Sequence, residues 1–417
     1  NCSMMSSTKD LSSLCCKPAV IHRNRSEKII LIVAVIASRY RCAALCSGPI
    51  YNRLQHICLF ATMSSTDKIM PQRQSHIQDA FTDLRSNPNK IFLLDGGTGE
   101  ELFRRNVPDD RKIWSAIALV HPQYNAVLED VHTAFLQSGS NAITTNSYGV
   151  VPGVGFDEQE IFKYIDLSGK IARSATQKQC VHSPSPTFVL GSLGPLVESY
   201  RPDMIMSHDE GVKCYQHACQ ALAPHVDAFL AETMSCIEES IQLLEAVASY
   251  PGGAESSFER QRRCLMISYS LDPKGNFRDG EDILDGMRRI LEQAEKKRPN
   301  VQLLAILFNC SEPEAINKAL EKMHSDADLI KTLQGCRPDG ILLGAYAHKL
   351  TDIDPNWTLA ESDASQPLRT DLSEKQYWEN FVKVWIDKLG VKIVGGCCGI
   401  TPKHISYIRA ELEKRGQ

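Results

Sequence analysis

Eight short apolar runs alternate with longer helical patterns along the chain from Lys90 onward. Strand-like and helix-like segments in alternation are typical of βα units, in which the strands lie parallel in one sheet. An open, doubly wound sheet is the competing architecture, but its first strand would lead into a G-x-G-x-x-G turn, which "DGGTGEEL" does not fit. The count of eight predicts an α/β fold with a single, closed (β/α)8 barrel of the TIM type. The predicted strands span residues 91–97, 141–147, 187–194, 228–234, 264–272, 301–311, 340–347 and 391–399.

One helical pattern between these runs has clear signals at both ends. The segment "SEKQYWENFVKVWIDKLG" begins with Ser373, a favoured N-cap residue, and finishes at Gly390, a residue favoured just beyond a helix. We therefore expect a helix between these two residues.

The first 62 residues differ from the rest in charge. They hold eight Lys and Arg against two acidic residues, a balance of +6, so a whole-chain charge of -4 leaves -10 for the remainder. Their apolar run, residues 29–37, is too short to span a bilayer. An organelle transit segment and an untranslated upstream reading frame with a start at Met63 are both open, and we favour the second slightly. We expect a non-core leader over 1–62, a lead-in over 63–88 and the barrel over 89–417.

Composition limits the partners that such a chain can have. At 417 residues and 43% hydrophobic, it is long enough to bury a large core. A pI near 6.3 gives no basic surface of the kind that nucleic-acid binding requires. We expect small-molecule partners, no nucleic acid and no membrane. The 15 cysteines are scattered through predicted strands and helices, so we expect most of them to be reduced and buried.

Each predicted strand ends in a residue with distinctive chemistry. In (β/α)8 barrels, the carboxyl ends of the strands and the loops that follow them form the active site. Each of these residues also has a simpler interpretation, since Asp95 and Glu232 are suited to cap the helices that follow and a lone cysteine is usually an inert core residue. The strand-end residues are Asp95, Thr145, Ser192, Glu232, Ser270, Cys310, Tyr346, and Cys397 with Cys398.

The adjacent Cys397 and Cys398 suggest a metal site. Neighbouring residues of a regular strand point to opposite faces, but flanking glycines can adopt backbone angles that bring both sulfurs to the mouth of the barrel. Cys310 supplies a third thiol from another strand end, and three thiolates with one open position describe a catalytic zinc site. A strained vicinal disulfide that acts as a redox switch, or two buried thiols, are the alternatives. The glycines are Gly395, Gly396 and Gly399.

A series of motifs resembles the homocysteine S-methyltransferase family. In chain order they read "LLDGGTGEEL", "SNAITTNSYG", "GSLGP", "AFLAETM", "FNC" and "GGCCGITPKHI", and they cover about Lys90 to Glu413. The resemblance implies a zinc-dependent barrel enzyme that transfers a methyl group to the sulfur of homocysteine and forms methionine. It assigns the zinc ligands to Cys310, Cys397 and Cys398, the substrate amine to Asp95 and Glu232, and the surroundings of the substrate carboxylate to Gly96 and Thr145.

The chemistry of these residue types agrees with that assignment. A thiol bound to zinc is deprotonated, so no general base is obligatory, and a dry site favours attack of the thiolate on a sulfonium because opposite charges neutralise. A cationic donor can rest on aromatic faces, for which Trp114 and Tyr148 are candidates. We expect S-methylmethionine or S-adenosylmethionine as donor in preference to betaine.

Other functions are distinguished by sequence features. The loops after the third and seventh strands depart from the family's usual pattern, which leaves the donor open. Cobalamin-dependent methionine synthases would need extra modules and a D-x-H-x-x-G motif, which this chain does not contain. A zinc hydrolase would use histidine and carboxylate ligands, and a redox-sensing barrel would need only the vicinal thiols. We expect a cytoplasmic enzyme, unless residues 1–62 direct it to an organelle.

Overall fold

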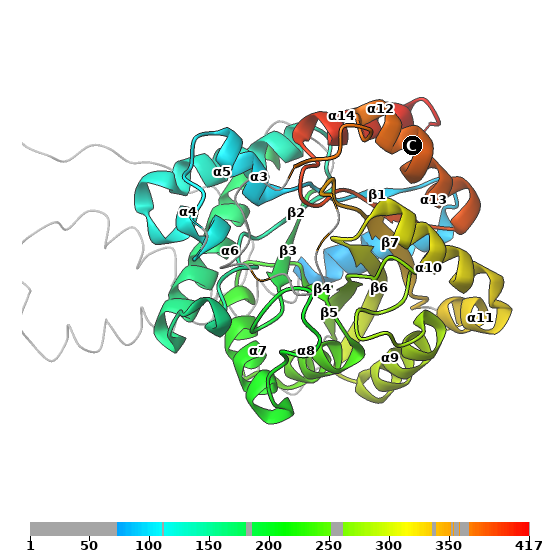
Figure 1. Cartoon of the computed structure of the whole chain (residues 1–417), viewed down its shortest axis with the longest axis horizontal. Helices are drawn as coiled ribbons and strands as arrows, with labels where there is room; N and C mark the ends of the chain where they lie inside the picture. Colours follow the sequence, from blue (N-terminus) through cyan, green and yellow to red (C-terminus); the bar gives the residue numbers. More distant parts are fainter. Residues whose placement is uncertain are drawn as a thin grey trace, which may run out of the picture. The chain divides into compact units, whose positions relative to one another are not determined.

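The computed structural model describes residues 73–416, apart from residues 111, 181–185, 252–261, 336–338, 352, 354–357 and 359–366. Its centre is one sheet of eight parallel strands in the order β1-β8-β7-β6-β5-β4-β3-β2, which curls into a barrel (Figure 1). The predicted α/β barrel is confirmed. The strands are β1 (Phe92–Leu93), β2 (Ala142–Thr144), β3 (Phe188–Leu193), β4 (Ala228–Met234), β5 (Arg263–Tyr269), β6 (Val301–Asn309), β7 (Leu342–Tyr346) and β8 (Ile393–Val394).

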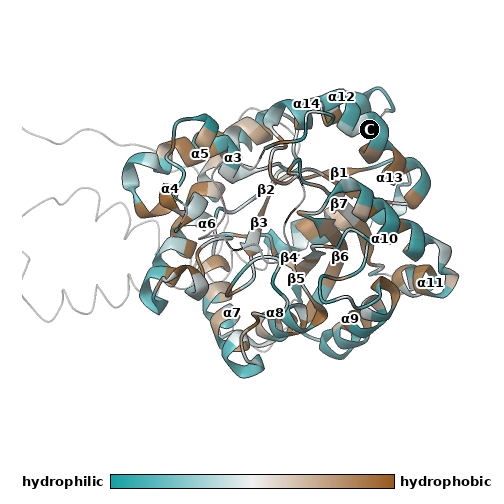
Figure 2. Ribbon diagram, viewed as in Figure 1, coloured by the Kyte–Doolittle hydropathy of each residue, from teal (hydrophilic) through white to brown (hydrophobic). Residues whose placement is uncertain are grey.

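Helices surround this sheet, and their outward surfaces are largely hydrophilic (Figure 2). The α-helices are α3 (Thr98–Arg104), α4 (Ile117–Val120), α5 (Asn125–Gln137), α6 (Glu158–Cys180), α7 (His208–Leu222), α8 (Ile237–Ser249), α9 (Ile283–Lys297), α10 (Pro313–Ser325), α11 (Ala327–Gly335), α12 (Glu374–Tyr377), α13 (Lys383–Leu389) and α14 (Pro402–Glu413). Short 3-10 helices span η1 (Trp114–Ala116), η2 (Pro122–Tyr124) and η3 (Pro152–Val154). Residues 73–86 form one more helix before β1.

Each predicted strand overlaps an observed one, but the first and last are much shorter than expected. The predicted runs 91–97 and 391–399 reduce to two residues each in β1 and β8. Backbone hydrogen bonds between the two segments continue beyond these residues, from Leu94 N to Val394 O at 2.7 Å and from Gly396 N to Asp95 O at 3.0 Å. The glycine-rich segments at this end carry the candidate site residues Asp95, Cys397 and Cys398.

The edge between β1 and β2 is closed partly by side chains. Asn141 N donates to Leu93 O at 2.7 Å, and the Asn141 side-chain oxygen accepts from Leu93 N at 2.8 Å. Two residues beyond the end of β1, the Asp95 carboxylate accepts from Thr144 N at 2.8 Å. A short β1 can therefore still complete the barrel, because polar side chains replace part of the ladder.

The helix over residues 73–86 fills the end of the barrel where the strands begin. Ile77, Phe81 and Leu84 are buried there, and the Phe81 ring lies 5.3 Å from that of Phe92. These residues belong to a core cluster formed by inward-facing strand residues such as Phe188. The amino-terminal end of the barrel is thus packed with apolar side chains.

The helix expected between Ser373 and Gly390 has the predicted ends. Ser373 forms a capping box with Gln376, and Gly390 adopts a left-handed conformation with φ of 69°. Between α12 and α13, the residues of η4 (Trp378–Val382) form a π-helix, which the sequence pattern does not predict.

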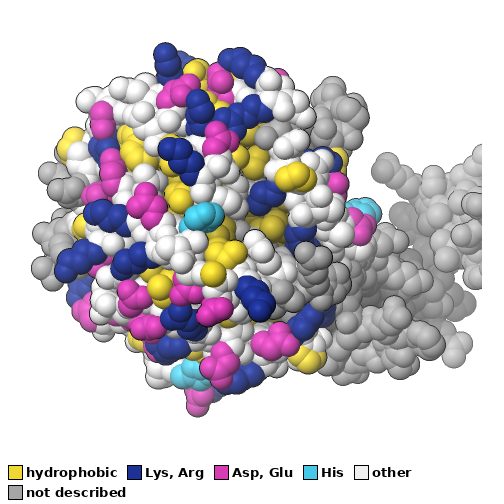
Figure 3. All heavy atoms as spheres, turned by 90° about the vertical axis from the view of Figure 1, so that its right-hand side faces the viewer, with side chains coloured by type: hydrophobic (Ala, Val, Ile, Leu, Met, Phe, Trp, Pro, Cys, Tyr) yellow, Lys and Arg dark blue, Asp and Glu magenta, His cyan; other side chains and the backbone are white. Residues whose placement is uncertain are grey.

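The predicted leader over residues 1–62 lies outside the described residues. Within the part of the chain that the structure describes, no helix combines the length and apolar character needed to cross a membrane. Figure 3 shows acidic and basic side chains interspersed over one face of the molecule, as the balanced composition predicts.

Candidate active site

The carboxyl ends of the strands surround a cavity of about 340 Å³. Of the other strand-end residues, Tyr346 lines this cavity and Ser192 and Ser270 do not. All nine residues that the sequence predicts for the site contribute to the lining. They are Asp95, Gly96, Trp114, Thr145, Tyr148, Glu232, Cys310, Cys397 and Cys398.

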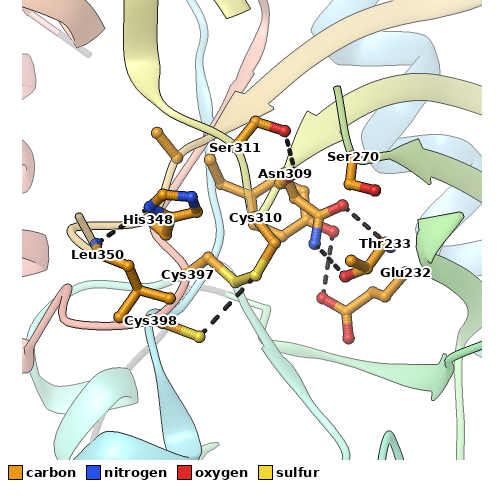
Figure 4. The surroundings of a disulfide bond; sticks show 12 residues. Glu232, Thr233, Ser270, Asn309, Cys310, Ser311, His348, Leu350, Cys397 and Cys398 are labelled. Carbon is orange, nitrogen blue, oxygen red and sulfur yellow. Dashed lines mark hydrogen bonds between the residues drawn. A yellow bond between two sulfur atoms is a disulfide. The ribbon is translucent and has the colours of Figure 1, made fainter. Parts of the chain in front are cut away.

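Three cysteine sulfurs meet at one side of the cavity (Figure 4). Cys310 and Cys397 are joined by a disulfide bond across 87 positions, whereas Cys398 is free. The disulfide of this structure therefore joins Cys310 to Cys397 and is not the vicinal one between Cys397 and Cys398. The turn brings the sulfurs of both Cys397 and Cys398 next to that of Cys310.

The donor set fits a zinc ion once the disulfide is reduced. The three sulfurs lie within 4.8 Å of one another. The Cys398 and Cys310 sulfurs are 3.9 Å apart, close to the separation of about 3.8 Å between two sulfurs of one tetrahedral zinc site. Because only thiolates bind zinc, the disulfide and a metal-bound form exclude each other. The described residues that line the cavity include no histidine, which is the ligand expected of a zinc hydrolase.

The glycines around the two cysteines allow this turn in two different ways. Gly399 has φ of 80°, which a side chain would strain. Gly396 and Gly395 are required instead by close approach, because a Cβ at Gly396 would lie 2.1 Å from the Ile400 side chain and one at Gly395 2.6 Å from Leu94. The expectation that all three supply unusual backbone angles is correct only for Gly399.

Asp95 is held by the strand beside it. Its carboxylate accepts from the backbone N and the hydroxyl of Thr144, both at 2.8 Å. Burial raises the pKa of Asp95 to about 6, although the Thr144 hydrogen bonds oppose the shift. Asp95 does not cap the following helix, whose N-cap is Gly97. The simpler interpretation of Asp95 as a helix cap is therefore wrong.

Glu232 is held by two other strand ends. It accepts from the Ser192 hydroxyl at 2.5 Å and from the Tyr346 hydroxyl at 3.1 Å. Burial, together with the negative charge of Asp95, raises the pKa of Glu232 to about 7. The helix that follows β4 has Cys236 at its N-cap, so Glu232 is not a cap either. A buried and a half-buried carboxyl with raised pKa values in one cavity are suited to bind a cation.

Thr145 and Gly96 complete the predicted substrate contacts. The Thr145 hydroxyl is 2.8 Å from that of Ser147 and accepts from Ser192 N at 2.9 Å. A Cβ at Gly96 would lie 2.4 Å from the carbonyl oxygen of Ile400, so only glycine fits there. The sequence did not predict a role for Thr144, the neighbour of Thr145, and "NAITTNS" gives no signal as to which threonine contacts Asp95.

An aromatic wall faces the acids. The Trp114 and Tyr148 rings pack edge to face with centroids 6.1 Å apart, and the Tyr148 hydroxyl is 2.7 Å from that of Ser199. Tyr200 also lines the cavity, and its ring stacks against the guanidinium of Arg278 at 4.5 Å. The sequence does not predict a role for Tyr200, because this residue lies in the loop after the third strand, where the family pattern is lost.

The charged residues that line the cavity are mostly acidic. The described lining contains four carboxylic acids and one lysine. A cavity of this charge favours a cationic ligand over an anionic one. The acids are Asp95, Glu100, Glu198 and Glu232, and the lysine is Lys112.

Unusual backbone conformations gather at the same place. Five non-glycine residues of the described chain have positive φ, and four of them line the cavity. Such conformations cost free energy and persist where the surrounding structure imposes them, often at functional sites. The four are Trp114, Tyr200, Thr233 and Cys310.

The family model for homocysteine S-methyltransferase matches residues 92–412, most of the chain. This chain belongs to the homocysteine S-methyltransferase family. Among curated members, Homocysteine S-methyltransferase 2 of Saccharomyces cerevisiae is 24% identical over 351 residues, which is 79% of this chain and 97% of that protein. The homocysteine S-methyltransferase of Escherichia coli is 24% identical over 342 residues, 77% of this chain and 94% of that protein.

Two further members extend the comparison. A betaine-homocysteine S-methyltransferase of Drosophila melanogaster is 23% identical over 350 residues, covering 78% of this chain and 94% of that protein. The crystal structure of the homocysteine methyltransferase MmuM from Escherichia coli in its metallated form has a TM-score of 0.57 at 23% identity, covering 77% of this chain and 96% of that one. The oxidized form of MmuM matches equally well. These structures show the shared barrel fold.

Proposed function

We propose that this chain catalyses zinc-dependent methyl transfer from a sulfonium donor to the thiol of L-homocysteine, giving methionine. One observation carries the proposal: the sulfurs of Cys310, Cys397 and Cys398 line the same cavity as the buried carboxyls of Asp95 and Glu232. Homocysteine has a thiol at one end and an ammonium at the other, so a site with metal ligands and acids suits both ends.

The residues of the chain divide the binding of homocysteine between them. Asp95 and Glu232 hold the ammonium, while Gly96 and Thr145 lie beside the carboxylate. A bound zinc would supply the deprotonation of the substrate thiol. The thiolate attacks the methyl carbon, the bond from that carbon to the donor sulfur breaks, and the bonding electrons convert the sulfonium to a neutral thioether. The proton of the thiol leaves to solvent.

The charge of the cavity supports a sulfonium donor. Besides the two acids that hold the homocysteine ammonium, Glu100 and Glu198 line the cavity against one lysine, Lys112. This excess of acids favours a molecule with net positive charge, and both S-methylmethionine and S-adenosylmethionine carry one at neutral pH. Betaine is a zwitterion without net charge, so the acids gain less from it. The faces of Trp114 and Tyr148 attract a cationic methyl group of either type, and the Drosophila relative is named for betaine. Betaine is therefore the alternative donor.

The test combines metal analysis with a donor comparison on the reduced protein. We expect one zinc per chain, proton release when homocysteine binds, and methionine formed fastest from one of the two sulfonium donors. Fastest transfer from betaine would reject the sulfonium donor but keep the homocysteine acceptor. A reduced protein that binds no zinc, or that forms no methionine from any of the three donors, would show that the proposal is wrong.

A further inference from the structure

Strand β4 contains one extra residue where it reaches the cavity. Its pairing with β5 runs from Ala231 opposite Ile267 to Met234 opposite Tyr269, so three steps on β4 face two on β5. This β-bulge contains Glu232 and the residue after it. Bulges next to active sites commonly redirect a side chain. Glu232 continues the inward-facing alternation of Ala228 and Leu230, and the bulge begins at this residue.

Thr233 gives this bulge an unfavourable backbone. Its φ of 61° is rare for a β-branched residue, whose side chain crowds the left-handed region. A conformation of this kind needs other contacts to hold it. The contacts that hold Thr233 therefore also decide where Glu232 lies.

The side-chain amide of Asn309 supplies these contacts (Figure 4). Its oxygen accepts from Thr233 N at 3.0 Å, and its nitrogen donates to the Thr233 hydroxyl at 2.9 Å. The same oxygen accepts from the Ser268 hydroxyl at 2.7 Å. Asn309 is 1% exposed. A buried amide with three bonds to two strands fixes their relative position, because each bond lost there leaves a polar group without water.

Asn309 is also joined to the cysteine cluster. It is the last residue of β6 and directly precedes Cys310, which has φ of 42°. The Asn309 carbonyl accepts from the Ser311 hydroxyl at 2.9 Å, which closes the turn around Cys310. One residue thus connects the turn that holds a predicted metal ligand with the bulge that holds a predicted substrate acid.

We infer that Asn309 is a positioning residue that sets the distance between the amine-binding and thiol-binding halves of the site. This inference rests on the proposed function, because that function gives the two halves one substrate. Asn309 lines the cavity, and its side-chain bonds go to Thr233 and Ser268 of the neighbouring strands. It acts through Thr233, which fixes Glu232, and through the backbone of Cys310.

The test compares two buried amides on the same strand. Gln302 lies near the start of β6, is 5% exposed and donates to Asp339 at 3.2 Å. Both Asn309→Ala and Gln302→Ala should lower the melting temperature. Only Asn309→Ala should raise KM for homocysteine, by roughly ten- to a hundredfold as for the loss of buried hydrogen bonds, and only it should lower zinc occupancy at a fixed chelator concentration.

A milder variant covers the case in which Asn309→Ala does not fold. Thr233→Val keeps Asn309 and removes only the hydroxyl that accepts from its amide nitrogen. It should raise homocysteine KM, by less than Asn309→Ala does, because the bond from Thr233 N to the Asn309 oxygen remains. An unchanged KM in folded Thr233→Val, or a melting temperature of Asn309→Ala that falls while KM and zinc occupancy stay at wild-type values, would overturn the inference.

These readouts separate this inference from the proposed function. Zinc occupancy, and homocysteine binding measured by calorimetry, can both be determined without a methyl donor. A wild-type protein that binds both but transfers no methyl group would reject the proposed reaction alone. A fully active wild type with an unaffected Asn309→Ala would reject the positioning role alone.

Discussion

The two ends of the barrel are built from the same eight strands but differ in almost every physical respect. At the amino-terminal end, apolar residues such as Phe92 and Phe188 pack against Ile77 and Phe81 of the preceding helix. At the carboxyl end lie the buried acids, the three clustered thiols and four residues with positive φ. Regular geometry characterises the first end and irregular geometry the second.

This contrast indicates where stability and function reside. Burial alone favours the neutral form of a carboxyl, and the raised pKa values of Asp95 and Glu232 measure that cost. The apolar packing of the amino-terminal end stabilises a fold whose mouth carries this cost, so variants at the two ends should separate activity from stability.

The largest expected effect is the loss of a cysteine at the mouth of the barrel, and a cysteine at the amino-terminal end is its control. Cys310→Ala should remove zinc and reduce methyl transfer by more than the roughly 100-fold typical of losing a group that only supports a metal ligand. Cys264→Ala, near the start of β5, should keep full zinc and cost about 1–3 kcal/mol of stability. Metal analysis and urea unfolding measure the two results. Stoichiometric zinc and activity in Cys310→Ala would contradict the three-thiolate site.

Phe81→Ala should produce the complementary result. Removal of a buried ring from the amino-terminal end of the barrel should lower the free energy of unfolding by about 3–5 kcal/mol and leave homocysteine KM unchanged. The control is Phe162→Ala on α6, because Phe162 is 40% exposed and its loss should change stability by less than about 0.5 kcal/mol. A KM that rises in folded Phe81→Ala would show that the two ends are coupled.

The next comparison is between an acid that lines the cavity, Glu232, and a buried acid that does not, Glu239. Glu232→Gln should weaken homocysteine binding by about 2–5 kcal/mol and leave zinc bound, because it removes the charge opposite the ammonium. Glu239 on α8 is a more deeply buried acid, and burial raises its pKa to about 7 as well, but it does not line the cavity. Calorimetric binding to Glu239→Gln should match wild type. Equal affinity in Glu232→Gln would remove this residue from the substrate site.

The smallest expected effect is the dependence of substrate binding on pH. Asp95 and Glu232, with pKa values of about 6 and 7, ionise as pH rises from 5 to 8, so homocysteine KM should fall by about tenfold or more across that range. The step near pH 7 should be missing in Glu232→Gln.

Stability of the ligand-free protein should change with pH in the opposite direction. Both carboxyls bind a proton more tightly in the folded chain than in the unfolded one, so stability falls as pH rises from about 4 to 7. Thermal melts with and without homocysteine should therefore diverge as pH rises.

The sequence predicts much of this molecule because strand ends in a parallel barrel meet at one mouth. Asp95, Glu232 and Cys310 lie far apart in the chain, yet knowing that each ends a strand is enough to place them together. The strand over 228–234 was predicted with its observed bounds. Apolar runs and their terminal residues are local signals, and the barrel converts them into a site.

The contacts between the strand ends were not predictable in the same way. That Ser192 and Tyr346 would donate to Glu232, or that Thr144 would contact Asp95, depends on strand register and on a bulge that no local pattern marks. The pairing of Cys397 with Cys310 likewise depends on the direction in which a glycine-rich turn sends two sulfurs. Such details follow from three-dimensional geometry, and a single sequence carries no separate signal for them.

The helix over residues 73–86 has a kinetic consequence as well as a structural one. Because Ile77, Phe81 and Leu84 fill the amino-terminal end of the barrel, the cavity is closed at that end. Homocysteine and the donor would enter, and both products would leave, through the mouth at the carboxyl ends of the strands. The molecule that lies nearer this opening must leave before the deeper one, so the order in which the two products leave should follow their depth in the cavity.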